Sequence, residues 1–209
     1  MKKPATPVVS ARKAPRQSRS KQLVEAILEA AIRVLSREGA TRFTTARVAE
    51  TAGVSVGSLY QYFPNKEAIL FRLQTDEWKR TSELMHSILA DQSRPPLERL
   101  HATVQAFFVS EWEEASLRVA LGDAAPSYKK APEVAEHRRA GRERSRRFMT
   151  ELLPHASLKE RRFATDFVMT TMSVVGKKVS EQSRSRAEVE VWAQAMGEML
   201  CGYLSRCMT

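Results

Sequence analysis

The chain has 209 residues, with 34 Lys and Arg against 24 Asp and Glu, so its formal net charge is +10. This length holds one large domain, or a small domain joined to a larger one, and either can fold without a metal or a disulfide. Cys201 and Cys207 fit neither a CxxC redox pair nor a zinc site, so we interpret them as free thiols of a reducing cytoplasm. No apolar run suits a signal peptide or reaches the roughly 20 residues that span a bilayer. We expect a cytoplasmic protein with no cofactor, no metal and no membrane partner.

The positive charge is concentrated near the start of the sequence. Residues 1–66 contain 12 basic and 4 acidic residues, whereas the rest of the chain is nearly neutral. A basic end on a neutral body is typical of a protein that binds a polyanion, nucleic acid before membrane. A solvated basic tail is the alternative interpretation.

Apolar residues recur at spacings of three and four along the chain, which predicts an all-α protein. Residues 1–17 hold three prolines and little apolar matter, so we expect a disordered basic arm that either follows a minor groove or stays in solvent. A first helix is expected over 20–38, with Gly39 ending it. Further long helices are expected over 65–91, 96–114, 131–153, 157–180 and 186–207.

Residues 43–63 have the pattern of two short helices joined by a tight turn. Thr44 or Thr45 can cap the first helix, and Ser55 can cap the second. Gly53 supplies the positive backbone angle that turns the chain between them. The segment therefore predicts a helix-turn-helix.

The second of these helices is expected to bury Leu59 and Phe63. Its N-terminal and outer surface then presents Val56, Gly57, Ser58, Tyr60, Gln61 and Tyr62. That layout is typical of a recognition helix in the major groove of double-stranded DNA. Asn65 is expected to cap the next helix, which places Lys66 in its first turn, where a lysine opposes the helix dipole and calls for a nearby anion.

A longer pattern runs through this region: Thr44-Thr45, Ala52-Gly53-Val54-Ser55, Gly57-Ser58-Leu59-Tyr60-Gln61-Tyr62-Phe63, Asn65-Lys66-Glu67 and Leu70. Over about residues 20–73 it resembles the DNA-binding domain of the TetR family of bacterial regulators. The resemblance implies a three-helix DNA-binding domain linked by a fourth helix to a larger helical domain that binds a ligand and dimerises. We accordingly expect a DNA-binding domain over 18–64 and an effector-binding and dimerisation domain over 65–209.

The resemblance also implies roles at the DNA. By matching position, Thr45, Tyr60, Tyr62 and Lys66 contact phosphate, and Val56, Gly57 and Ser58 approach base edges. Ala46 stands where some family members have a long polar base-reading side chain, so Arg47 or the basic arm is expected to take over that role. The complete set of expected DNA-binding residues is Thr44, Thr45, Arg47, Ser55, Val56, Gly57, Ser58, Tyr60, Gln61, Tyr62 and Lys66.

Aromatic and methionine side chains at helical spacing in the larger domain are typical of a core, and also of a pocket between helices. The candidate lining of an effector pocket is Trp78, Met85, Phe107, Phe108, Trp112, Met149, Phe163 and Phe167. We expect an apolar or aromatic small molecule there. The helix expected over 131–153 also carries a run of arginines: Arg138, Arg139, Arg142, Arg144, Arg146 and Arg147. We interpret this run as a largely solvated helix face. The alternative is that it binds an acidic ligand or a partner protein.

The last two expected helices carry an apolar stripe broader than one neighbouring helix would cover. The expected dimer interface is Met172, Val175, Gly176, Val189, Trp192, Ala193, Met196, Leu200, Tyr203 and Leu204. A closed homodimer is the natural symmetry for a protein that reads an inverted repeat.

These patterns indicate a DNA-binding transcriptional regulator. The resemblance to the TetR family implies a repressor that a small-molecule effector releases from a near-palindromic operator. A ligand-independent DNA-architectural or RNA-binding protein is the alternative. The histidines form no HxxxH or HExxH pair and the glycines form no phosphate loop, so the sequence does not indicate an enzyme.

Overall fold

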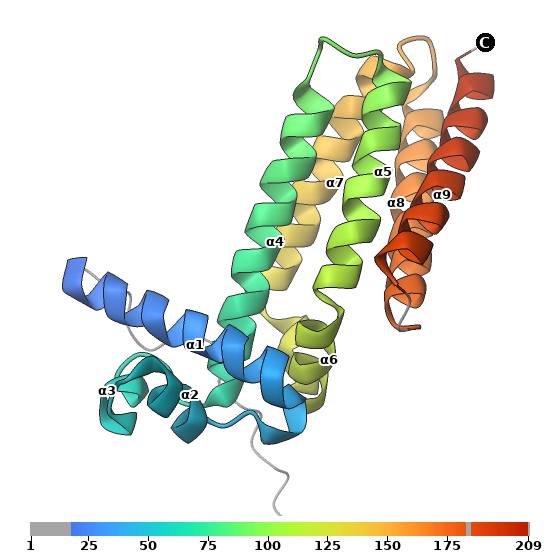
Figure 1. Cartoon of the computed structure of the whole chain (residues 1–209). Helices are drawn as coiled ribbons and strands as arrows, with labels where there is room; N and C mark the ends of the chain where they lie inside the picture. Colours follow the sequence, from blue (N-terminus) through green and yellow to red (C-terminus); the bar gives the residue numbers. More distant parts are fainter. Residues whose placement is uncertain (1–17, 183–184, 209) are drawn as a thin grey trace, which may run out of the picture. The chain divides into compact units, whose positions relative to one another are not determined.

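The computed structural model describes residues 18–182 and 185–208, and within these ranges every regular element is a helix (Figure 1). The expected all-α class is confirmed. The helices are α1 (Ser18–Arg42), α2 (Thr45–Ala52), α3 (Val56–Tyr60), α4 (Lys66–Ala90), α5 (Pro96–Glu113), α6 (Ala115–Ala124), the 3-10 helix η1 (Pro126–Lys130), α7 (Pro132–Leu152), α8 (Leu158–Ser180) and α9 (Arg186–Cys207). The expected arm over 1–17 lies outside the described residues. In the part of the chain that is described, no helix is both long enough and apolar enough to cross a bilayer.

Local sequence signals account for most helix ends. Ser157 and Ser185 open α8 and α9 with complete capping boxes, in which a glutamate three residues later bonds back to the serine. Gly39 has φ 73° and ψ 175°, so it breaks α1 where the sequence predicts an end, although a short helical stretch continues to Arg42. α6 and η1 were not expected, because residues 115–130 are short elements without the long apolar periodicity of their neighbours.

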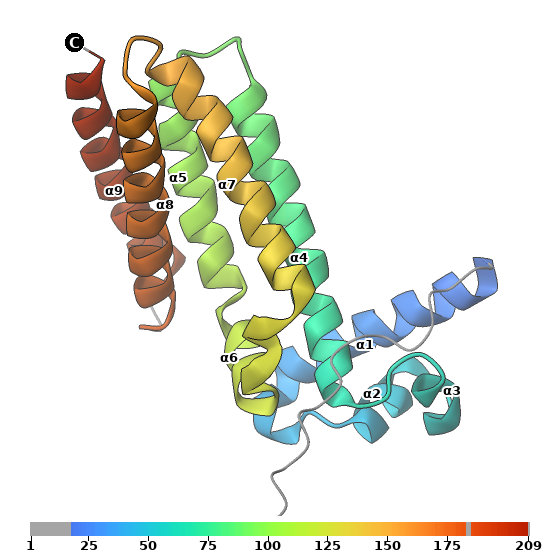
Figure 2. The ribbon, with the colours of Figure 1, turned by 180° about the vertical axis from the view of Figure 1, so that it is seen from behind.

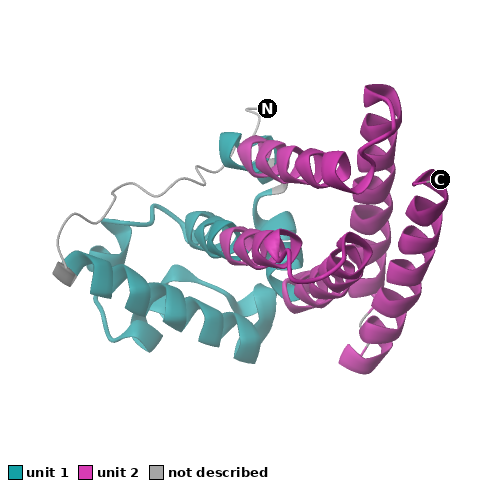
Figure 3. Cartoon of the chain, turned by 90° about the horizontal axis from the view of Figure 1, so that it is seen from above, with its two compact units in different colours: residues 1–77, 116–134 teal, residues 78–115, 135–209 magenta. Residues whose placement is uncertain are grey.

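The described residues form two compact units, coloured separately in Figure 3. Unit 1 comprises residues 18–77 and 116–134, and unit 2 comprises residues 78–115 and 135–208 apart from 183–184. α4 contributes to both units, and residues 116–124 of α6 belong with η1 to unit 1. These units differ from the expected division after residue 64, because the first three turns of α4 are grouped with the helix-turn-helix.

Unit 1 packs α1 against α2, and α2 against α3. Its buried apolar side chains come from every helix of the unit and include Ile27, Val34, Val48, Leu59, Phe63, Ile69, Leu70 and Leu121. The rings of Phe71 in α4 and Tyr128 in η1 lie 6.4 Å apart and tilted, which ties the η1 segment to the start of α4. The helix-turn-helix therefore rests on a core that extends beyond its own three helices.

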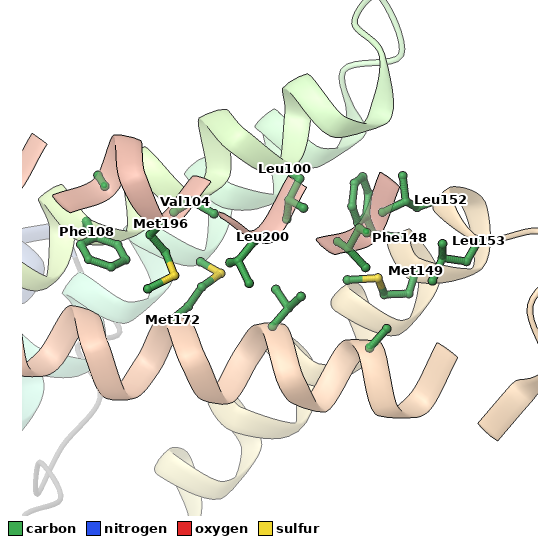
Figure 4. Close-up of a cluster of buried hydrophobic side chains, with 14 of the residues drawn as sticks. Leu100, Val104, Phe108, Phe148, Met149, Leu152, Leu153, Met172, Met196 and Leu200 are labelled. Atoms are coloured by element: carbon green, nitrogen blue, oxygen red, sulfur yellow. The ribbon is translucent and has the colours of Figure 1, made fainter. Parts of the chain in front are cut away.

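Unit 2 contains residues 78–90 of α4 together with α5, α7, α8 and α9, which run alongside one another in both views (Figure 1, Figure 2). Its closest backbone packing is among α5, α8 and α9. The core, most of which is drawn in Figure 4, is built by Leu100, Val104, Phe108, Phe148, Met149, Leu152, Leu153, Ala164, Val168, Met172, Val179, Val189, Ala193, Met196, Leu200 and Leu204.

Gly176 and Gly197 let α8 and α9 approach α5 closely. A Cβ built on Gly197 would lie 2.5 Å from Cδ2 of His101, and one on Gly176 would lie 2.8 Å from Cε1 of Phe107. Both separations are shorter than van der Waals contact. Side chains at these two positions would therefore force the helices apart.

Gly197→Ala is expected to lower the free energy of unfolding by about 1–3 kcal/mol, because its methyl group overlaps the His101 ring. Gly122→Ala in α6 is the matched control, since a Cβ there meets nothing within 4 Å. The control should be neutral, or stabilising by up to about 1 kcal/mol through helix propensity. Urea denaturation of both variants measures the difference, and equal midpoints would contradict the close α5–α9 packing.

Candidate nucleic-acid interface

α2 is held by caps at both ends. The backbone N–H of Arg47 donates to Oγ1 of Thr44 at 3.3 Å, so Thr44 is the N-cap. At the other end Gly53 has φ 68° and ψ 30°, and its N–H donates to the carbonyl of Glu50 at 3.1 Å. That left-handed backbone conformation is strained for residues that carry a Cβ, which explains the glycine at the turn.

α3 is the exposed helix of the motif. Ser55 caps it, accepting from the N–H of Ser58 at 3.0 Å. Leu59 is fully buried, while Val56, Gly57, Tyr60 and Gln61 are exposed and Ser58 is half-buried. The helix ends at Tyr60, earlier than expected, and presents the small residues Gly57 and Ser58 in its first turn, where a DNA backbone or base edge can approach closely.

Tyr60 is linked to α2 by a side-chain hydrogen bond. Its hydroxyl lies 3.1 Å from Oγ1 of Thr45, and either atom can donate. The family resemblance implies a phosphate contact for each of these two side chains, and the structure holds them as a pair, one from each helix of the motif. The pairing spans 15 positions of sequence and arises only when the two helices cross.

Arg47 forms an ion pair with Glu38, in the last turn of α1 before the break at Gly39. The sequence assigned Arg47 to the DNA, but it gave no sign of this acidic partner. Both side chains remain partly exposed. The pair joins α1 to α2 and leaves the other donors of the guanidinium available.

Lys66 and Tyr62, the two remaining expected phosphate contacts, lie in different surroundings. Asn65 accepts from the N–H of Ala68 at 2.8 Å and so caps α4, which places Lys66 at the first helical position, half-buried. Tyr62 is only 7% exposed and lies next to the buried Phe63. Most of the Tyr62 side chain is therefore inside unit 1.

The expected pocket residues fall into three groups in unit 2. Phe108 and Met149 are core residues, and Phe107 and Trp112 pack against that core. Trp78 stacks on His137 with ring centroids 5.1 Å apart, and Met85 is half-buried. Phe163 and Phe167 stack on each other and are exposed on α8. The structure does not bring all of these side chains to one place.

The side chains of the expected dimer stripe differ in how far they are exposed on the protomer. Most of its members are buried inside the protomer itself: Met172, Gly176, Val189, Ala193, Met196, Leu200 and Leu204. Val175 and Tyr203 are half-buried, and of the expected set only Trp192 is exposed. The physical reason is that α9 uses this stripe to pack on α5 and α8.

A second apolar stripe lies on the opposite side of α8 and α9. We call it the outer stripe and define it by six exposed side chains: Phe163, Phe167, Val174, Val191, Trp192 and Met199. Phe167 also reaches Tyr203 of α9, with ring centroids 4.9 Å apart, so the α8 and α9 parts of the stripe adjoin. Exposed apolar side chains gathered on two adjacent helices are typical of a protein–protein interface.

Two capped helices joined by a left-handed glycine, with polar and small residues exposed on the second, define a helix-turn-helix DNA-binding protein. Residues 27–73 match the family model described as "Bacterial regulatory proteins, tetR family", and residues 95–207 match the one described as "Tetracyclin repressor-like, C-terminal domain". The chain belongs to the TetR family of transcriptional regulators.

The chain is also similar to curated relatives over part of its length, and to solved structures in fold. Nucleoid occlusion factor SlmA of Vibrio campbellii is 37% identical over 91 residues, covering 34% of this chain and 46% of that protein. The chain thus spans about half the length of the curated relatives that it matches. A putative TetR-family regulator from Mesorhizobium loti is similar in fold, with TM-score 0.70, 17% identity, and coverage of 90% of this chain and 98% of that one. FadR from Bacillus subtilis, solved in complex with stearoyl-CoA, has TM-score 0.59 and 19% identity, with coverage of 85% and 97%.

Proposed function

We propose that this regulator is a homodimeric repressor that binds a near-palindromic operator and is released by a small-molecule effector. The observation that carries the proposal is the joined surface of α2 and α3, on which Thr45 and Tyr60 are linked and Gly57 and Ser58 are accessible. Paired hydroxyls suit a phosphate, and small residues suit close approach to base edges.

The outer stripe supports the homodimer. An interface made from the same two helices of each protomer is self-complementary, as a twofold axis requires. It shares Trp192 with the stripe expected from sequence, but most side chains of that expected stripe are buried within the protomer. Two DNA-binding units related by this axis would read two half-sites about one helical turn apart.

A small-molecule effector has support in the fold neighbour FadR, which was solved in complex with stearoyl-CoA. Binding of an effector weakens operator affinity only if the effector prefers the free shape of the protein over the DNA-bound shape. The test is therefore a coupled one: fluorescence anisotropy of a labelled operator, titrated with aromatic and fatty compounds. If compounds that raise the melting temperature never shift the operator affinity, the repressor-release proposal fails.

Lys66→Ala tests the DNA contact at the start of α4. Because Lys66 is proposed to meet phosphate only, the substitution should weaken all DNA sequences alike. It should also lower the slope of log affinity against log salt by about 1 for each phosphate no longer neutralised, which is about 2 per dimer. Lys79→Ala, an exposed lysine further along α4 in unit 2, is the control and should leave the slope unchanged. An unchanged slope for Lys66→Ala would contradict the assignment.

A second candidate function follows from the curated relatives, which are named nucleoid occlusion factors. In that case the chain would bind DNA at dispersed sites, and no small molecule would release it. Chromatin immunoprecipitation separates the two functions, since a repressor occupies few promoters whereas a nucleoid factor occupies many sites along the chromosome. A preference for RNA over duplex DNA would contradict both.

A further inference from the structure

One arginine of the α7 run is placed differently from the others. Arg144 is half-buried in unit 2, and its guanidinium donates to the hydroxyl of Ser82 on α4. Within residues 18–182 and 185–208, no carboxylate lies within ion-pair distance of it. Partial burial of a guanidinium without an anion beside it has a desolvation cost unless something else compensates the charge.

The neighbouring arginines show how the chain compensates such charges elsewhere. Arg139, Arg142 and Arg147 on α7 are exposed and are paired with Glu136, Asp166 and Glu143. Arg99 is almost completely buried, and it pairs with Glu151 and lies over the ring of Phe148. Arg144 is thus a half-buried cation in unit 2 that the protein has left with a neutral hydroxyl alone.

The surroundings of Arg144 are suited to an organic molecule. His137, Gly141 and Arg144 share one face of α7, at spacings of four and three. His137 stacks on Trp78, and neither of its ring nitrogens has a hydrogen-bond partner among the described residues. Gly141 has no side chain, and the nearest atom to a Cβ built there is Cε of Met169 at 3.9 Å.

The electrostatics of this face favour an anion. Burial, together with the positive charges of Arg144 and Arg138, lowers the pKa of His137 below its ordinary value. Of these causes, the positive charges of the two arginines would also stabilise a negative group placed beside them. Among the described residues of unit 2, α4 and α7 are not one of the helix pairs whose backbones pack closely.

We propose that Arg144, Ser82 and His137 form the anion-binding end of a ligand site in unit 2, specific for a small organic anion with an apolar body. The guanidinium fork and the serine hydroxyl receive the anionic head, a carboxylate or a phosphate. Trp78 and Met169 contact the apolar body, and Gly141 gives it room. This inference rests on the proposed effector-responsive function and names the chemical class of the effector.

The test is isothermal titration calorimetry on the full chain without DNA. The probes are hexanoate, octanoate, phenylbutyrate and octyl phosphate, with octanamide as the neutral match of octanoate. Saturable binding of at least one anion is expected, and octanamide should bind at least tenfold more weakly than octanoate. Comparing octanoate with octyl phosphate tells which anionic head the site prefers.

Arg144→Gln should weaken anion binding by about 10- to 100-fold, which is the effect of losing a charged hydrogen bond. Arg147→Gln removes an exposed arginine of the same helix and should leave the affinity unchanged. Gly141→Leu should weaken binding by filling the space beside Met169. Circular dichroism checks that each variant is folded, and Arg144→Lys, which keeps the charge but loses the fork, should retain part of the affinity even if Arg144→Gln unfolds.

The proposal is overturned if no anion binds, if octanamide binds as tightly as octanoate, or if Arg144→Gln and Arg147→Gln behave alike. Those outcomes leave operator release by an uncharged effector intact. Conversely, Arg144-dependent binding of an anion that never alters operator affinity would support the site and contradict the proposed effector-released repression.

Discussion

A chain carrying both Trp192→Glu and Met199→Glu is expected to be a folded monomer that no longer binds its operator. The two side chains are 41% and 49% exposed on the outer stripe, so the carboxylates meet water in a lone protomer. In a dimer built on this stripe they would be buried without partners, at a cost of about 3–5 kcal/mol for each. Sedimentation velocity and operator anisotropy on the same samples measure both effects.

Leu200→Glu gives the contrasting result. Leu200 is fully buried between α9 and the rest of the unit 2 core, so a carboxylate there should unfold unit 2 rather than release a folded monomer. Ser205→Glu, on the exposed polar side of α9, is the control and should change neither sedimentation nor folding. If the Trp192/Met199 double variant sediments as an unchanged dimer, the outer stripe is not the interface, although the DNA-binding unit is unaffected by that outcome.

Phe108→Ala is expected to reduce the free energy of unfolding by about 3–5 kcal/mol. Phe108 is 1% exposed and belongs to the core that Val104, Met149 and Leu200 also build (Figure 4). Removing its ring leaves a cavity that close-packed neighbours cannot fill. The effect is therefore on stability first, and on ligand response only through it.

Urea denaturation measures this loss of stability, with Leu84→Ala as the control. Leu84 is 48% exposed on α4, so its truncation should change stability by no more than about 0.5 kcal/mol. The opposite result, an unchanged urea midpoint for Phe108→Ala together with an abolished effector response, would place Phe108 in a ligand site instead of the core.

The helix-turn-helix could be predicted from sequence because its determinants are local. Thr44, Gly53 and Ser55 act on backbone groups within a few residues of themselves, so their types and spacing specify the caps and the turn. α6 and η1 could not be predicted in the same way. They are short, and their place in unit 1 depends on contacts such as Phe71 with Tyr128, more than fifty positions apart.

The outer stripe shows that the spacing of apolar residues cannot by itself predict which face of a helix is buried in the protomer. α9 carries two apolar faces with the same helical spacing, one through Leu200 and one through Met199. Spacing alone does not tell which face the protomer covers itself, because both satisfy the amphipathic pattern. The pairs Thr45–Tyr60 and Arg47–Glu38 were missed for a related reason, since they depend on how helices cross and leave no sequence signal.

Selection of duplexes from a random DNA pool by the full-length protein tests the central claim most directly. If two DNA-binding units act about a twofold axis, the enriched sequences will share an inverted repeat whose half-site centres lie about 10 base pairs, or a multiple of that, apart. Thr45→Ala and Tyr60→Phe should lower recovery without changing the repeat, because they remove phosphate contacts and not base readout. Enrichment of a single half-site, or of no common sequence at all, would contradict the assignment of this protein as a dimeric operator-binding regulator.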